Sequence, residues 1–147
     1  MRLTKQSNYA VRALVYCAVN DPHLSRVSDI AKSYAISEMF LFKLIKPLVG
    51  SGMIETTRGR NGGIRLAKPA SNITILEAIQ ASEDFKLTES FADASQELVA
   101  EQEFNALLKE ALNSFFEVLQ GYTIADLITN GSQIRDVLGI RSDQPEH

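Results

Sequence analysis

Residues 56–66 read Thr56-Thr57-Arg58-Gly59-Arg60-Asn61-Gly62-Gly63-Ile64-Arg65-Leu66. Short apolar runs, Met53-Ile54 and Ile64-Arg65-Leu66, lie on either side of the glycines. This pattern predicts a β-hairpin in which Asn61-Gly62-Gly63 supplies the positive φ angles of a tight turn. Arg58 and Arg60 would lie at the hairpin tip. Arginine is favoured in the narrow minor groove of DNA, which a hairpin tip can enter where a helix cannot.

Three helices are predicted before the hairpin. Residues 7–20 place apolar side chains at helical spacing, and Asp21-Pro22 ends the pattern. Ser28 is expected to cap a short helix that runs through Ala35, and Ser37 to cap a longer one that begins at Glu38. Two helices joined by a tight turn form a helix-turn-helix. A helix, a helix-turn-helix and a two-stranded wing, in this order, describe a winged helix.

The second helix of this motif contains a proline near its end. Pro47 lacks a backbone N–H and is expected to bend or loosen the last turn. Gly50 and Gly52 then end the helix and lead into the hairpin. The fold class predicted is therefore mainly α, with a small β-hairpin wing.

The rest of the chain divides by composition. Lys68-Pro69-Ala70-Ser71-Asn72 is a linker, residues 73–82 form a short helix, and the polar tail begins beyond Ile140. We divide the chain into a winged-helix domain (1–80), an acidic loop (81–100), a long helix (101–121), and a C-terminal short helix with a tail (122–147).

The long helix has a regular apolar stripe over about five turns. A winged helix of this size does not need so long an apolar helix to close its own core, so we expect the stripe to pack against a second copy of the chain. Its members are Phe104, Leu108, Ala111, Leu112, Phe115 and Leu119.

The formal net charge of −3 hides an asymmetry. Residues 1–80 carry 11 Lys and Arg against 5 Asp and Glu, whereas residues 81–147 carry 4 against 13. A basic first half suits a polyanion such as nucleic acid. The chain contains one cysteine and no run of 18 apolar residues, so we expect a cytoplasmic protein with no membrane segment.

Catalytic chemistry finds little support. The sequence has no phosphate-binding loop, no dinucleotide fingerprint and only two histidines, His23 and His147, so we expect neither an enzyme nor a bound metal. Cys17 lies on the apolar face of the first helix and is expected to be an inert, buried side chain. A redox-sensing thiol at Cys17 is the alternative.

Candidate DNA contacts fall on three segments. The start of the second motif helix would enter the major groove, the wing would reach the minor groove or the phosphates, and the N-terminus would add phosphate contacts. The candidates are Ser37, Glu38, Met39 and Lys43 on the helix, Arg58, Arg60, Asn61, Gly62 and Gly63 on the wing, and Arg2, Thr4, Lys5 and Tyr9 at the N-terminus.

Several of these segments together resemble a known family. They are Met1-Arg2-Leu3-Thr4, Tyr9-Ala10-Val11-Arg12, the Ser37 helix, the Arg58–Gly63 wing, Lys68-Pro69-Ala70, the long helix and Tyr122-Thr123-Ile124-Ala125-Asp126-Leu127. This combination resembles the Rrf family of bacterial winged-helix regulators (the IscR, NsrR and RirA group), and RirA- and NsrR-like members most of all. The resemblance implies a homodimer, formed through the long helices, that binds a palindromic operator in double-stranded DNA.

The chain departs from the family in the acidic loop. Many members hold an iron–sulfur cluster there with three cysteines, and the matching positions here are Ser90, Gln96 and Gln102. Asn8 occupies the position of an aspartate that serves as a further ligand in NsrR-like proteins. A cluster requires thiolates or imidazoles. We therefore expect no cluster, and the mixed substitutes favour natural divergence.

The sequence thus predicts a sequence-specific DNA-binding transcriptional regulator, a homodimeric repressor that uses no iron–sulfur cluster. Two alternatives stay open. The winged helix could instead serve as a protein-interaction module. The chain could also be a regulator that senses a thiol-reactive or small molecule through Cys17, or through a pocket between the wing domain and the dimer helix.

Overall fold

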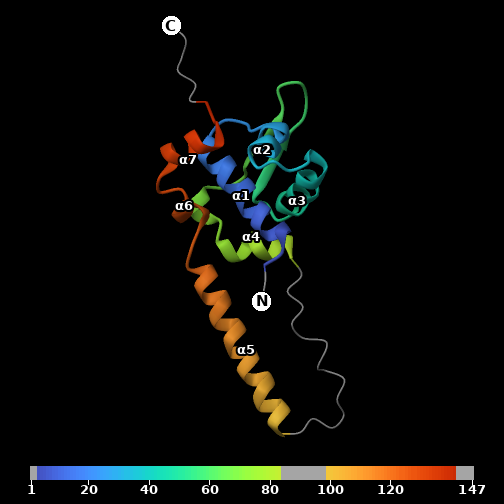
Figure 1. The fold of residues 1–147 in the computed structure, drawn as a ribbon, viewed down its shortest axis with the longest axis vertical. Helices are drawn as coiled ribbons and strands as arrows, with labels where there is room; N and C mark the ends of the chain where they lie inside the picture. Colours follow the sequence, from blue (N-terminus) through green and yellow to red (C-terminus); the bar gives the residue numbers. More distant parts are fainter. Residues whose placement is uncertain (1–2, 84–98, 142–147) are drawn as a thin grey trace.

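The computed structural model describes residues 3–83 and 99–141, which form a small head and a long helix that projects from it (Figure 1). The architecture is mainly helical with one two-stranded antiparallel hairpin, which confirms the predicted fold class. Its elements are α1 (Lys5–Asn20), α2 (Val27–Ser33), α3 (Glu38–Gly50), β1 (Ile54–Thr57), β2 (Gly63–Leu66), η1 (Ala70–Asn72), α4 (Ile75–Ser82), α5 (Val99–Gln120), α6 (Ile124–Leu127) and α7 (Gly131–Leu138).

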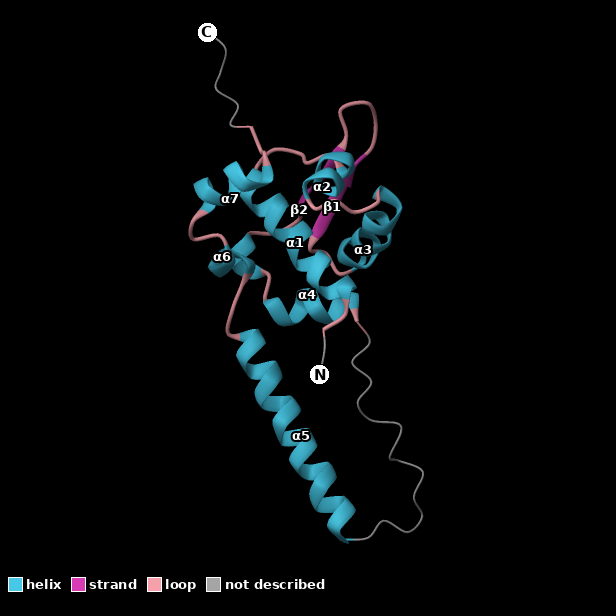
Figure 2. Cartoon of the chain, in the orientation of Figure 1, coloured by secondary structure: helices cyan, strands magenta, loops and turns pink. Residues whose placement is uncertain are grey.

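Helix α1 lies at the centre of the head, with α3, α4, α6, α7 and β2 packed around it (Figure 2). Most residues of its buried face have small or medium apolar side chains, which let the neighbouring helices approach closely. Ala10, Ala13, Leu14 and Cys17 on this face are all 0% exposed. Burial of these side chains, together with Leu41, Leu48, Ile73 and Ile124 from the surrounding elements, forms one continuous core.

The helix-turn-helix is present, with one correction at its start. Val27 is the first residue of α2 and Arg26 is its N-cap, without a side-chain hydrogen bond, so the prediction that Ser28 caps the helix is wrong. The physical reason is tertiary. Ser25 is paired with Ile64 of the wing by two backbone hydrogen bonds of 2.8 Å, which fix the extended backbone directly before the helix.

The turn and the second helix follow the prediction more closely. α2 ends at Ser33, and Ala35 then adopts a left-handed φ of 53°. Ser37 caps α3 as predicted, since its Oγ accepts a hydrogen bond of 3.1 Å from the Phe40 N–H. α3 continues past Pro47, whose carbonyl accepts a hydrogen bond of 3.0 Å from the Ser51 N–H, so the last turn stays hydrogen-bonded.

The wing pairs Thr57 with Gly63 and Glu55 with Arg65. Positive φ is found at Gly59 (111°) and not within Asn61-Gly62-Gly63, so that part of the prediction is wrong. Gly62 and Gly63 are required for a different reason, which is space. A Cβ on Gly62 would lie 2.2 Å from the Thr57 carbonyl oxygen, and one on Gly63 would lie 2.6 Å from the Ser25 carbonyl oxygen.

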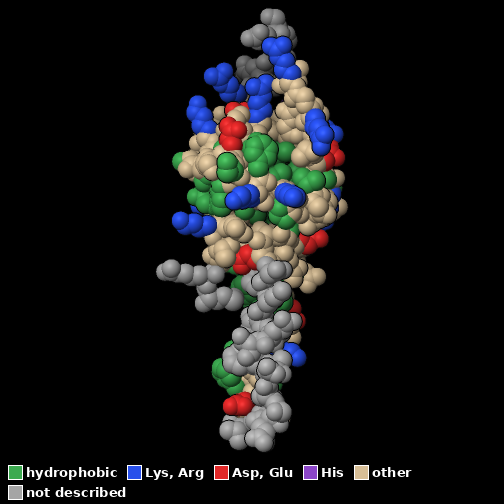
Figure 3. Space-filling view, turned by 90° about the vertical axis from the view of Figure 1, so that its right-hand side faces the viewer, with side chains coloured by type: hydrophobic (Ala, Val, Ile, Leu, Met, Phe, Trp, Pro, Cys, Tyr) green, Lys and Arg blue, Asp and Glu red, His purple; other side chains and the backbone are tan. Residues whose placement is uncertain are grey.

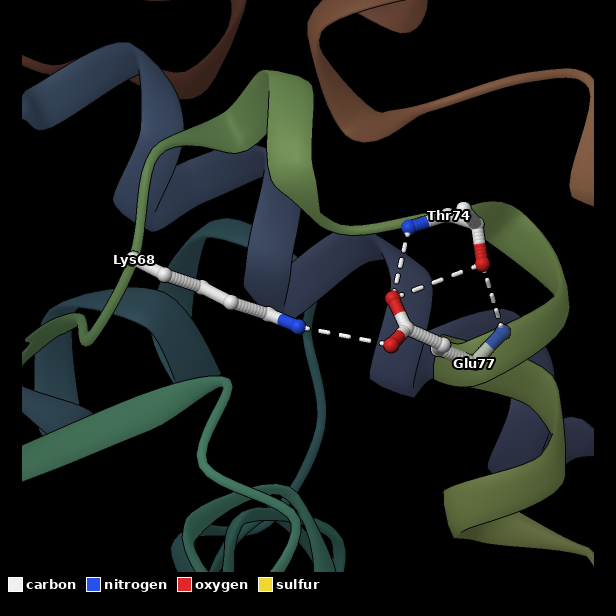
Figure 4. Close-up of polar contacts among 3 residues, drawn as sticks. All are labelled: Lys68, Thr74 and Glu77. Carbon is white, nitrogen blue, oxygen red and sulfur yellow. Dashed lines mark hydrogen bonds and ion pairs between the residues drawn. The ribbon is translucent and has the colours of Figure 1, made fainter.

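A capping box begins α4 (Figure 4). The Thr74 hydroxyl accepts a hydrogen bond of 3.1 Å from the Glu77 N–H, and the Glu77 carboxylate accepts one of 3.0 Å from the Thr74 N–H. The same carboxylate accepts a hydrogen bond from Lys68 Nζ at 3.3 Å. These hydrogen bonds hold the pKa of Glu77 below its usual value, and the bond from the Thr74 backbone contributes most.

The C-terminal part of the chain returns to the head. Thr123 and Asp126 begin α6 as a short capped helix, as predicted, and Thr74 and Thr123 form an antiparallel bridge. A second helix, α7, was not predicted. Its apolar residue Leu138 and the following Ile140 pack on the core, and Gly139 closes it with a left-handed φ of 68°. Residues 122–141 are therefore part of the head.

Helix α5 leaves the head and extends away from it (Figure 1). Of the predicted stripe, Phe104 is 55% exposed, Ala111 is exposed, and the other four members are half-buried. Leu107 and Val118, outside the predicted stripe, are 63% and 61% exposed. The predicted loop lies almost wholly outside the described residues, which resume at Val99.

Candidate nucleic-acid interface

Helix α3 presents one face to the core and the opposite face to solvent. Leu41, Leu44 and Leu48 are buried, whereas Met39 is 73% exposed and Lys43 is exposed. Of the other predicted contacts, Glu38 is exposed in the first turn, and the Ser37 hydroxyl already accepts the capping hydrogen bond. The structure therefore keeps Met39 and Lys43 available on the outward face.

The wing presents its basic residues at the tip. Arg58, Arg60 and Asn61 are exposed between the two strands, with Gly62 half-buried behind them. Arg65 differs, because its guanidinium forms an ion pair with Glu55 on the neighbouring strand. Within the described ranges, Arg58 and Arg60 take part in no ion pair, so these two cations are available to a polyanion.

The N-terminal candidates gather on one side of α1. Thr4, Lys5 and Tyr9 line a shallow depression of about 230 Å³, together with Asn8 and Arg12. Arg2 lies outside the described residues. The Thr4 hydroxyl caps α1 and is hydrogen-bonded to the Glu83 carboxylate, so it is engaged within the chain.

Arg12 is a further cation of this surface and is not among the predicted contacts. Its guanidinium carbon lies 5.1 Å from the ring centre of Tyr9 and 5.6 Å from that of Tyr34. Stacking on two aromatic rings restricts the guanidinium while leaving it cationic. The signal was present in the sequence, since Tyr9 and Arg12 are three residues apart on one helix.

Aromatic contacts set the position of α3 against α1. The Tyr9 ring packs edge-on against Phe40 of α3 at 5.8 Å between ring centres. Tyr34, at the end of α2, contacts Tyr9 and Tyr16 and donates a hydrogen bond of 2.9 Å to the Arg12 carbonyl oxygen. Burial raises the pKa of Tyr34 to about 12, so this hydroxyl remains a neutral donor.

Figure 3 shows the side of the head on which α3 lies. Hydrophobic side chains gather in the middle of this face, and Lys and Arg side chains lie on and around them. A cationic surface of this kind, centred on a helix whose outer face is unpacked and with a basic hairpin beside it, can neutralise phosphates and reach base edges at the same time.

Comparison with known proteins agrees with this geometry. A family model, Rrf2, described as "Iron-dependent Transcriptional regulator", matches residues 3–130. The chain belongs to the Rrf2 family. This confirms the resemblance found in the sequence, and the Rrf2 chain is accordingly a DNA-binding transcriptional regulator.

Two curated relatives and one solved structure illustrate the match. The chain is 52% identical over 143 residues to Protein aau3 of Rhizobium meliloti, covering 95% of this chain and 93% of that protein. It is 38% identical over 144 residues to the HTH-type transcriptional regulator NsrR of Oceanobacillus iheyensis, covering 95% and 98%. The structure of T. potens IscR superposes with a TM-score of 0.72 at 22% identity. The match covers 92% of this chain and 91% of that chain, which shows a shared fold.

The donor set of this Rrf2 chain does not fit an iron–sulfur cluster. The sequence contains one cysteine, Cys17, which is 0% exposed in the core. Burial raises the pKa of its thiol to about 12, so Cys17 does not supply the thiolate that a cysteine ligand of a cluster must be. Among the predicted ligand-equivalent positions, Gln102 is exposed on α5, while Ser90 and Gln96 lie outside the described residues.

The head has a cleft at a different place from the predicted pocket between the wing domain and the dimer helix, and that pocket stays a prediction. A cleft of about 670 Å³ lies beside α1, α2 and the α7 segment, and α5 contributes no residue to it. Its lining mixes cations and anions, including Arg26, Lys32, Asp29 and Asp136.

No helix in the described ranges is long and apolar enough to cross a membrane.

Proposed function

We propose that the protein is a cytoplasmic, homodimeric repressor that binds a palindromic operator in double-stranded DNA. It performs no catalytic step and binds DNA without an iron–sulfur cluster. The proposal rests on the family, on the basic surface formed by α3 and the wing, and above all on the apolar stripe that α5 carries outside the head.

The proposal of a dimer depends mainly on the exposure of apolar side chains on α5. A helix of 22 residues projects from the head, with Phe104 of the stripe 55% exposed and Leu107, beside the stripe, 63% exposed. Most of the stability of helices in proteins comes from the packing of an apolar face. Pairing with α5 of a second copy supplies that packing and buries the same residues on both subunits.

Operator binding follows from the dimer. A two-fold axis presents two α3 helices to successive major grooves, roughly 34 Å apart, and requires half-sites of inverted sequence. Arg58 and Arg60 at each wing then contact the flanking phosphates or minor groove. A bound dimer occupies the promoter and excludes polymerase sterically, which is why we propose repression.

The absence of a cluster rests on ligand chemistry. Cys17 is the single cysteine of the chain and lies in the core of α1. Opening the core to release one thiolate would still leave a cluster short of its other ligands. The chain therefore does not gain or lose operator affinity through cluster assembly.

A paired experiment tests both parts. Sedimentation of the purified protein is expected to give the mass of two subunits, and selection from a random DNA pool is expected to return an inverted repeat without added iron. Leu108→Glu should give single subunits and lose operator affinity. Ala106→Glu, on the opposite face of α5, is the matched control and should retain both. A single-subunit mass for the unmodified protein, or no preference for any duplex, contradicts the proposal.

A further inference from the structure

The first two turns of α3 carry two exposed apolar side chains that the fold does not use. Met39 is 73% exposed and Phe42 is 56% exposed. Phe40, between them in sequence, is half-buried and packs on Tyr9, so the exposure of its neighbours is not a general property of this turn. Apolar side chains of this size gain free energy when they are buried, so a partner that covers the pair is stabilised by the contact.

Helical geometry groups these residues with two cations. At 3.6 residues per turn, Met39, Phe42, Lys43 and Lys46 fall within a sector of roughly 100°. The buried residues Leu41, Leu44, Ile45 and Leu48 centre on the opposite side of the helix. The acidic residue of α3, Glu38, lies in the first turn and outside this sector. The sector is thus apolar and cationic, with no carboxylate.

This combination selects the kind of partner. An α-helix fits the major groove of B-DNA, and the apolar group exposed there is the 5-methyl of thymine. Lysines beside the apolar pair suit the phosphates that border the groove. The adjacent pair of lysines favours DNA over a protein partner, because phosphates border the major groove along its whole length.

We propose that Met39 and Phe42 read thymine 5-methyl groups in each operator half-site, while Lys43 and Lys46 contact the adjacent phosphates. This inference rests on the proposed function, because it names what the same surface recognises. It makes thymine at defined positions of the half-site a requirement that hydrogen bonding alone does not impose.

The test replaces thymines with deoxyuridine, which lacks only the 5-methyl group. The probe is an operator duplex selected from a random pool, bound to the unmodified full-length protein at fixed salt and followed by fluorescence anisotropy. We expect one or two positions in each half-site at which the replacement weakens binding about three- to fivefold.

Variants assign the effect to residues. Phe42→Ala and Met39→Ala should each remove the sensitivity at one thymine position and leave the other. Lys43→Ala, in the same sector, should weaken thymine and deoxyuridine duplexes by the same factor. Val137→Ala is the matched control, because Val137 is an apolar side chain 84% exposed on α7. This variant should remain fully sensitive to the replacement of thymine by deoxyuridine.

The outcomes separate this inference from the proposed function. Equal binding of thymine and deoxyuridine duplexes by the unmodified protein, with the operator still preferred over random competitor, overturns the inference alone. An operator without thymine in its half-sites does the same, as does a Phe42→Ala variant that weakens both duplexes equally. No preference for any duplex overturns the proposed function itself. The comparison of thymine and deoxyuridine duplexes on the unmodified protein tests the inference even where a variant fails to fold.

Discussion

Glu83 and Thr4 join the end of α4 to the beginning of α1, since the Glu83 carboxylate accepts hydrogen bonds from both the N–H of Thr4, at 2.7 Å, and its hydroxyl. The Ser7 hydroxyl donates to the same carboxylate oxygen. Burial acts to raise the pKa of Glu83, but these hydrogen bonds outweigh it, and the pKa lies below its usual value. One carboxylate therefore fixes the position at which α1 begins.

This arrangement predicts a pH-dependent contribution to stability. Because the folded pKa of Glu83 is lower than the unfolded one, the contribution is present above the unfolded pKa and is lost as the pH falls through the folded pKa. Glu83→Gln should lower Tm at pH 7, and the gap to the unmodified protein should narrow as the pH falls below the ordinary glutamate pKa of about 4.3. Thermal unfolding across pH measures this. Glu110→Gln, exposed on α5, is the control, and a pH-independent gap for Glu83→Gln would contradict the account.

The turn of the helix-turn-helix predicts a stabilising substitution. Ala35 has a φ of 53°, a left-handed backbone conformation that costs free energy for any residue with a Cβ. Ala35→Gly should therefore raise the free energy of unfolding by about 1 kcal/mol. Denaturant titration measures it. Ala106→Gly, inside α5 and exposed, should instead lower stability by about 1 kcal/mol. Destabilisation by Ala35→Gly would show that the turn is not strained.

Features fixed within one turn of chain could be predicted from the sequence. The Ser37 cap and the short helix that Thr123 begins depend on residues three or four positions apart, and both are found. The start of α2 could not be predicted, because the pairing of Ser25 with Ile64 determines it from outside the helix. α7 was missed for a similar reason: Leu138 and Ile140 acquire their role only by packing on the core.

The same distinction applies to the candidate site. Helical spacing is enough to place Lys43 opposite the core, and hairpin length is enough to place Arg60 at the tip. The pairing of Arg65 with Glu55 depends on strand register, which the sequence did not specify. Phe42 is not among the predicted contacts, and its exposure of 56% is a finding of the structure.

The wing glycines predict a contrast between two alanine substitutions. A Cβ on Gly63 would lie 2.6 Å from the Ser25 carbonyl oxygen, which belongs to the backbone and cannot move aside cheaply. Gly63→Ala should therefore lower stability by about 1–3 kcal/mol. Gly50, at the end of α3, has nothing within 4 Å of its virtual Cβ, so Gly50→Ala should leave stability unchanged or raise it by up to about 1 kcal/mol. Equal effects in thermal unfolding would contradict this.

Cys17 predicts an unreactive thiol in the folded protein. The side chain is 0% exposed, and burial raises its pKa to about 12, so the thiol stays protonated at pH 7–9. Iodoacetamide at pH 8 should label the native protein far more slowly than the protein in denaturant, as counted by intact mass. Rapid labelling of the native protein would restore thiol sensing as a role for Cys17.

The two classes of wing arginine predict different losses of DNA affinity. Arg60 is exposed at the tip and takes part in no ion pair among the described residues, whereas the Arg65 charge is already paired with Glu55. Arg60→Ala should weaken operator binding about tenfold and reduce the slope of log affinity against log salt by about 1, because one phosphate contact is lost. Arg65→Ala, the matched control on the same hairpin, should change both quantities less. Anisotropy titrations between about 50 and 200 mM salt measure the two slopes. An unchanged slope for Arg60→Ala would place the wing tip away from the DNA backbone, and α3 would then have to account for the salt dependence through Lys43 and Lys46.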